Sequence, residues 1–183
     1  NLHLCSMKVS KDRLTDKNRQ TIRGNTIKGN ITKSIDLQMK TFRLVDNALG
    51  WLTFFIAAFV YCSTIEPTAS FWDCPEFITT GYRLEIGHPP GAPFFMLTAN
   101  LFSQFVSDPS QVARMVNTMS ALLSAATILF LFWSISHLTR RLITNSTDEL
   151  SWGKIITIEA AALVGSLIYT FSDTFWYSAV EGE

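Results

Sequence analysis

The sequence has few charged residues and few cysteines. Asp, Glu, Lys and Arg make up 16% of the 183 residues, well below the roughly one quarter found in soluble domains. The three cysteines are an odd number without CxxC or Cys/His spacing, so neither a disulfide framework nor a zinc site is indicated. There is no internal repeat and no alternation typical of a membrane β-barrel. The low proportion of charged residues argues against a soluble globular domain.

Basic residues are concentrated at the amino terminus. Residues 1–38 hold eight Lys or Arg against three Asp or Glu, although the formal net charge of the whole chain is zero. Aromatic residues are absent from this segment, so nothing supports nucleic-acid binding. Its polar composition predicts a disordered cytoplasmic tail, or a leader before a true start at Met39. Because the chain begins without Met and has no terminating signal, we expect an amino-terminal fragment of a longer protein.

Apolar residues, by contrast, are plentiful and clustered. They account for 48% of the chain, and they gather in three nearly uncharged stretches at residues 47–65, 115–139 and 155–172. Each stretch is close to the ~20 residues that cross a hydrocarbon core. Glu159 interrupts the third stretch, and we expect it to belong to the start of that helix. The pattern predicts an all-α membrane protein with about three transmembrane helices in residues 39–183.

A fourth apolar segment, residues 93–106, is too short to span the membrane and is typical of an interfacial helix. With three spans, the basic residues near helix ends fall on the cytoplasmic side, as the positive-inside rule requires. A fourth span would move Arg140 and Arg141 to the outer side. We therefore predict a cytoplasmic amino terminus and an outward loop, residues 66–110, that contains one juxtamembrane helix.

The outward loop contains two carboxylates, Asp73 and Glu76, whose spacing places them on one face of a helix. Two carboxylates at a water–lipid boundary could act as a general base and as the partner of a metal or a second proton site. The same spacing before Phe77, with Pro75 in the first turn, is also a capping-box arrangement. The residues alone do not decide between catalysis and capping, and the two roles are compatible.

A rigid elbow, residues 87–93, follows in the same loop. Its prolines push the preceding residues toward extended geometry, and we expect the elbow to fix His88 near Asp73 and Glu76. Arg83 is suited to binding a phosphate group, or alternatively to a salt bridge with Glu76 or Glu85.

At the outer end of the third predicted span, Asp173 and Glu181 lie on the same side of the membrane as Asp73. The Phe, Trp and Tyr residues between them are typical of an interfacial aromatic belt and, secondarily, of a binding surface.

Three segments of the sequence resemble a known family: residues 63–77 (STIEPTASFWDCPEF), 84–93 (LEIGHPPGAP) and 171–181 (FSDTFWYSAVE). They are similar to the amino-terminal region of glycosyltransferase family 117, also known as domain of unknown function 2723. That family is common in Bacteroidetes and related to eukaryotic protein O-mannosyltransferases. The resemblance implies a GT-C-like membrane glycosyltransferase, here an amino-terminal fragment that is inactive alone.

The resemblance also implies roles for individual residues. In that superfamily an acidic residue of the first outward loop is catalytic, and this position falls on Asp73, with Glu76 beside it. The expected reaction is an inverting transfer from a polyprenyl-phosphate sugar, whose phosphate would leave against Arg83 or His88. Pro75 departs from the family pattern, where glycine is expected, and it removes a backbone N–H beside the site.

The function expected from the sequence is transfer of a sugar to a protein or glycan hydroxyl on the outer, periplasmic face of a bacterial inner membrane. Asp73 and Glu76 are the predicted catalytic residues, and Arg83, His88, Asp173 and Glu181 are the predicted substrate-binding residues. No bound cofactor or metal ligand set is predicted, although a divalent metal stays open. The alternative is a non-catalytic multi-span protein, such as a transporter or a lipid-handling scaffold.

Overall fold

The computed structural model describes residues 2–70, 72–89, 91–144 and 150–182, with side chains at residue 29 and from residue 32 onward. Every regular element in this part of the chain is a helix, and it contains no strand. In chain order the elements are α1 (Leu2–Ser63), α2 (Cys74–Arg83), α3 (Pro93–Ser103), the short 3-10 helix η1 (Pro109–Gln111), α4 (Val112–Ile143), α5 (Trp152–Thr170) and α6 (Asp173–Val180). The predicted all-α class is confirmed.

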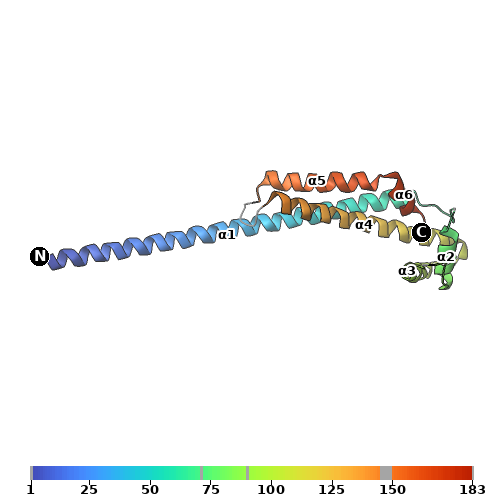
Figure 1. Ribbon diagram of the computed structural model, residues 1–183, viewed down its shortest axis with the longest axis horizontal. Helices are drawn as coiled ribbons and strands as arrows, with labels where there is room; N and C mark the ends of the chain where they lie inside the picture. Colours follow the sequence, from blue (N-terminus) through green and yellow to red (C-terminus); the bar gives the residue numbers. More distant parts are fainter. Residues whose placement is uncertain (1, 71, 90, 145–149, 183) are drawn as a thin grey trace.

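Three helical segments are long and apolar enough to cross a membrane. They are Thr32–Ser63 within α1, Pro109–Ile143, which joins η1 to α4, and Trp152–Thr170, which is α5. The helices α1 and α5 run in the same direction and α4 runs in the opposite one, so the chain passes back and forth along one axis (Figure 1). The predicted count of three spans is therefore confirmed.

The helix α4 lies at the centre of the bundle, where it contacts α1, α5 and α6. The end of the bundle next to residues 66–110 is called the outer end, after the predicted orientation. There the buried residues are mostly small, including Ala57, Ala121 and Ala125, and small side chains allow helix backbones to approach closely in a membrane. The buried Tyr61 hydroxyl donates a hydrogen bond to the backbone oxygen of Thr170, at 2.9 Å. This bond ties the outer end of α1 to the outer end of α5.

The amino-terminal segment, for which the sequence predicts a disordered tail or leader, has a helical backbone that continues α1 from Leu2. No proline occurs before Pro67, so nothing in this stretch blocks propagation of a helix that the membrane span has already formed. In Figure 1 this part of α1 extends well beyond the bundle. The division of the chain at residue 38 stays a prediction.

The outward loop contains two helices, α2 and α3, where the sequence predicts one. The predicted juxtamembrane helix is α3, which begins at Pro93. The additional helix α2 packs closely on it, since a Cβ atom on Gly81 would lie 2.8 Å from the Cβ of Ala99. Cys74 and Ile78 of α2 join an apolar cluster with residues at the start of α4. Both short helices are therefore held at the outer end of the bundle (Figure 1).

A buried asparagine on α4 fixes the chain that leaves the first span. The Asn117 side-chain amide donates to the backbone oxygens of Glu66 and Thr68, at 2.7 and 3.1 Å. In turn, the backbone N–H of Glu66 donates to the backbone oxygen of Val180, at 3.3 Å. The start of the outward loop is thus bonded both to α4 and to the end of α6.

Glu159 does not occupy the position expected from the sequence. It lies beyond the first turn of α5, which contains no acidic residue, and its side chain is 4% exposed. Neither carboxylate oxygen has a hydrogen-bond partner among the described residues. The expectation that Glu159 belongs to the start of its helix is therefore wrong, because packing against the neighbouring helices encloses its side chain.

Candidate active site in the outward loop

Asp73 immediately precedes α2 and occupies its N-cap position. Its backbone oxygen accepts a hydrogen bond from the N–H of Phe77, at 3.0 Å, but its side chain makes no capping bond. The reciprocal half of the predicted capping box is also absent, because the Glu76 carboxylate bonds to His88. The capping-box interpretation is therefore wrong for both side chains, and the Asp73 carboxylate is 60% exposed.

His88 lies between the two carboxylates, as the elbow predicts. Its backbone N–H donates to Oε1 of Glu76 at 2.7 Å, and its ring Nδ1 lies 3.1 Å from Oε2 of the same carboxylate. The other ring nitrogen, Nε2, is 3.9 Å from Oδ2 of Asp73. Gly87 permits this approach, because a Cβ there would lie 3.3 Å from Oε1 of Glu76. Pro90 of the same elbow lies outside the described residues.

This arrangement changes the protonation of both partners. The hydrogen bonds from the backbone and then the ring of His88 lower the pKa of Glu76. The hydrogen bond to Glu76 and its negative charge raise the pKa of His88, and Asp73 adds to the effect. The cluster therefore favours an imidazolium held between two carboxylates. All three groups remain accessible to a ligand, since each side chain is between 41% and 60% exposed.

Aromatic side chains pack against the His88 ring. The ring of Phe77 meets the His88 ring edge-on, with centroids 6.1 Å apart, and packs in the same way on Phe95, at 5.4 Å. Phe77 belongs to α2 and Phe95 to α3, so the imidazole is positioned by both short helices.

Arg83 pairs with Glu85, one of the two salt-bridge partners that the sequence leaves open. Its guanidinium lies 4.0 Å from the Glu85 carboxylate, and both side chains are more than half exposed. Among the described residues it forms no ion pair with Asp73 or Glu76. An exposed pair of this kind contributes little free energy, so the guanidinium can exchange Glu85 for another anion.

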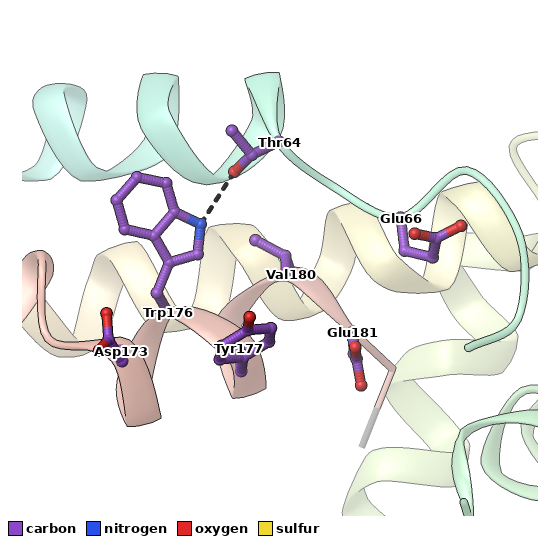
Figure 2. A pocket seen from close by; sticks show the side chains of 7 residues that line it. All are labelled: Thr64, Glu66, Asp173, Trp176, Tyr177, Val180 and Glu181. Carbon is purple, nitrogen blue, oxygen red and sulfur yellow. Dashed lines mark hydrogen bonds between the residues drawn. The ribbon is translucent and has the colours of Figure 1, made fainter. Parts of the chain in front are cut away.

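Asp173 and Glu181 line a separate pocket of about 340 Å³. Figure 2 shows Asp173 at the start of α6 and Glu181 just after its end, with the Tyr177 side chain between them. Trp176 and Glu66 also line the pocket, and Glu66 belongs to the segment that follows α1. The Trp176 indole N–H donates to Oγ1 of Thr64, at 3.1 Å. No hydrogen bond or ion pair in the described part of the chain joins this pocket to the cluster of Asp73, Glu76 and His88.

Two contributors to this region were missed from the sequence. Glu66 begins the predicted outward loop but is not among the predicted site residues, and it lines the pocket. Asn117 was passed over within an uncharged stretch, although an amide inside an apolar span is itself a signal of a specific hydrogen bond. Among the described residues, no group of three or more His, Cys, Asp or Glu side chains is arranged to hold a metal ion.

Comparison with known proteins decides the relationship. A family model described as the Protein O-mannosyl-transferase TMEM260 N-terminal domain matches residues 73–183. The chain belongs to this family. The match begins at Asp73 and includes the His88 cluster, the last two spans and α6, so it covers every predicted site residue.

A curated relative in Dictyostelium discoideum, named Protein O-mannosyl-transferase tmem260, is 26% identical over 133 residues. The aligned region covers 72% of this chain but 14% of the relative. No solved structure matches the chain.

Proposed function

We propose that the protein is a membrane glycosyltransferase that moves a sugar from a polyprenyl-phosphate donor to a protein or glycan hydroxyl. Membership in the O-mannosyl-transferase family and the name of the relative support transfer of a sugar. The three membrane-spanning helices suit a lipid-linked donor. The observation that carries the proposal is the placement of His88 between Asp73 and Glu76, in an accessible loop where the family match begins.

In the proposed reaction Asp73 is the general base. Its carboxylate accepts the proton of the acceptor hydroxyl while that oxygen forms a bond to the anomeric carbon. The bond from the anomeric carbon to the phosphate oxygen breaks, and its electron pair leaves with the lipid phosphate. Attack opposite the leaving group inverts the anomeric centre. Because phosphate is a stabilised leaving group, positioning and charge neutralisation are the main demands on the protein.

His88 and Arg83 would supply the neutralising charge. Glu76 favours the imidazolium form of His88, and an imidazolium can donate a hydrogen bond to the departing phosphate. Glu76 thus acts through His88 and is a positioning residue in this scheme, whereas the sequence-based hypothesis made it catalytic. Arg83 would exchange the exposed Glu85 carboxylate for the phosphate when the donor binds.

Asp173 and Glu181 are proposed to contact substrate from the second pocket. The described residues that line this pocket include three carboxylates and no cation. A phosphate would therefore be repelled there, and an acceptor rich in hydroxyl groups or positive charge fits better. Stacking of a sugar on the Trp176 or Tyr177 ring is consistent with the same choice.

The proposed orientation has a cytoplasmic amino terminus and the outward loop on the opposite, periplasmic face. The basic residues at the inner ends of the spans support it. A bacterial inner membrane is proposed from the family resemblance alone, as is the GT-C architecture.

The experiment that tests the function uses the protein in native membranes, incubated with a radiolabelled polyprenyl-phosphate sugar and an acceptor extract. Label should pass to a protein or glycan fraction with inverted anomeric configuration. Membranes from cells that lack the protein are the control. A chelator added to the same assay tests the divalent-metal dependence that the sequence leaves open. Label that stays in the lipid fraction would contradict the proposal.

A non-catalytic role in transport is the second candidate, because Glu159 is a buried carboxylate within a span and has no hydrogen-bond partner among the described residues. Intramembrane acids commonly mark substrate or proton pathways. Loss of function on changing Glu159 to Gln, combined with full function after changing Asp73 to Asn, would favour transport over transfer.

A further inference from the structure

A second charged pocket lies at the opposite end of the bundle from the outward loop. It has a volume of about 460 Å³ and is formed between α1 and α4. Its basic residues are Arg43, His137 and Arg140, and its aromatic wall includes Phe130 and Trp133. In Figure 1 the end of α4 and the start of α5 lie at the opposite end of the bundle from α2 and α3.

The two arginines of the pocket are Arg43 on α1 and Arg140 on α4. Among the described residues neither Arg43 nor Arg140 forms an ion pair with a carboxylate. Arg140 lies over the Phe42 ring, with its guanidinium carbon 5.3 Å from the centroid. Among the described residues that line the pocket, Asp46 is the one acid, and its carboxylate accepts a hydrogen bond from Ser136. The described lining therefore has two arginines against one carboxylate.

The order of side chains along α4 matches the layers of a membrane surface. Phe130 and Trp133 belong to the apolar part of the span, and Arg140 lies in its last turn. The seven residues from Trp133 to Arg140 rise by about 10 Å, enough to cross the roughly 5–7 Å interfacial region on one side of the hydrocarbon core. A lipid in this pocket would place its glycerol and upper acyl chain against the aromatic wall, with its phosphate between Arg43 and Arg140.

This pocket cannot serve the proposed transfer site. From Val112, which packs beneath α2, to Arg140 the helix rises by about 42 Å. A donor phosphate in reach of Asp73 therefore lies at the other membrane surface. The pocket needs an occupant of its own, and the inference about it depends only on insertion of the three spans in a membrane.

We propose that the pocket between Arg43 and Arg140 binds the phosphate head group of an anionic phospholipid. Basic pockets between transmembrane helices bind such head groups through charge and hydrogen bonds. The aromatic wall favours a lipid over a soluble phosphate, because a free anion would leave the apolar surface uncovered.

The test uses the complete membrane protein in a neutral detergent. Native mass spectrometry measures its binding of phosphatidylglycerol and of phosphatidylcholine with the same acyl chains. Phosphatidylglycerol should bind at least about fivefold more tightly, and Arg43→Gln and Arg140→Gln should each weaken its binding about fivefold. Because Arg140 also packs on Phe42, the exposed Arg43 provides the variant that is free of a packing change.

Arg141→Gln is the matched control, since it removes the same charge from the same helix turn but does not line the pocket. Its phosphatidylglycerol binding should equal that of the unaltered protein. An equal loss in the Arg141 variant would overturn the proposal in favour of general attraction to the basic surface. Equal binding of the two lipids would also overturn it, and so would displacement by millimolar inorganic phosphate, which would indicate a soluble ligand.

Discussion

His88 meets the Glu76 carboxylate twice, through its backbone N–H at 2.7 Å and through its ring Nδ1 at 3.1 Å. The two contacts join α2 to the elbow before α3, and they leave the other ring nitrogen facing Asp73 at 3.9 Å. One carboxylate therefore both closes the loop and orients the histidine toward the proposed base.

Changing Glu76 to Gln should lower the pKa of His88 toward its ordinary value of 6.5, because the negative partner is lost. If the imidazolium assists departure of the phosphate, the alkaline limb of the pH–rate profile should move to lower pH. Glu85→Gln, which alters the exposed partner of Arg83, is the control and should leave that limb in place. An unmoved limb in the Glu76 variant would separate His88 from the reaction.

The closure of the loop should depend on pH in a defined window. The raised pKa of His88 gives stability that is full below 6.5 and is lost as pH rises through the raised value. The lowered pKa of Glu76 gives stability that is full above 4.5 and is lost as pH falls through the lowered value. Protease cleavage of residues 66–110 in intact membranes should therefore be slowest between pH 4.5 and 6.5. A His88→Asn variant should lack this minimum, and a minimum that persists in it would refute the pair as its cause.

Asn117→Ala should destabilise the outer end of the bundle. The substitution leaves the backbone oxygens of Glu66 and Thr68 without their partner, which typically costs about 1–3 kcal/mol. Thermal unfolding in detergent should show a lower midpoint. Thr118→Ala on the same helix is the control, because its hydroxyl bonds only to the oxygen of Arg114 within α4. A midpoint equal to that of the control would mean that the two hydrogen bonds of Asn117 contribute nothing to stability.

Gly50→Ala should separate α1 from α4. The added Cβ would lie 2.7 Å from Nε1 of Trp133 and 3.2 Å from Cδ1 of Leu129, and overpacking of this kind costs about 1–3 kcal/mol. Gly29→Ala in the same helix should be neutral or stabilising, since a Cβ there meets nothing within 4 Å. Comparing the unfolding midpoints of the two variants tests whether the α1–α4 contact is as close as the structure has it.

The membrane architecture could be predicted because its signal is local. Uncharged stretches of sufficient length identify the three spans, and a proline at the start of α3 marks its first turn. His88 could be placed near the carboxylates because a rigid elbow has few available conformations. These predictions depend on short-range geometry, which the order of residues largely determines.

The remaining features depend on contacts between distant segments. The spacing of Asp73 and Glu76 is the same for a helix cap and for a pair that holds His88, so only the folded loop separates the two. The burial of Glu159 and the hydrogen bonds of Asn117 to the loop backbone arise from helix packing, which hydropathy does not describe. The pocket at Asp173 and Glu181 likewise requires Glu66, more than one hundred residues earlier, to come alongside α6.

The most direct test of the central claim is the rate of sugar transfer by Asp73→Asn in the complete protein, compared with Asp108→Asn. Asp108 is a carboxylate of the same loop that accepts from the backbone N–H of Ser110 and, among the described residues, forms no ion pair with Arg83 or His88. We predict that Asp73→Asn inserts normally and loses at least about a hundredfold in transfer rate, while Asp108→Asn keeps the original rate. Transfer by Asp73→Asn at the rate of the unaltered protein would contradict the assignment of Asp73 as the base.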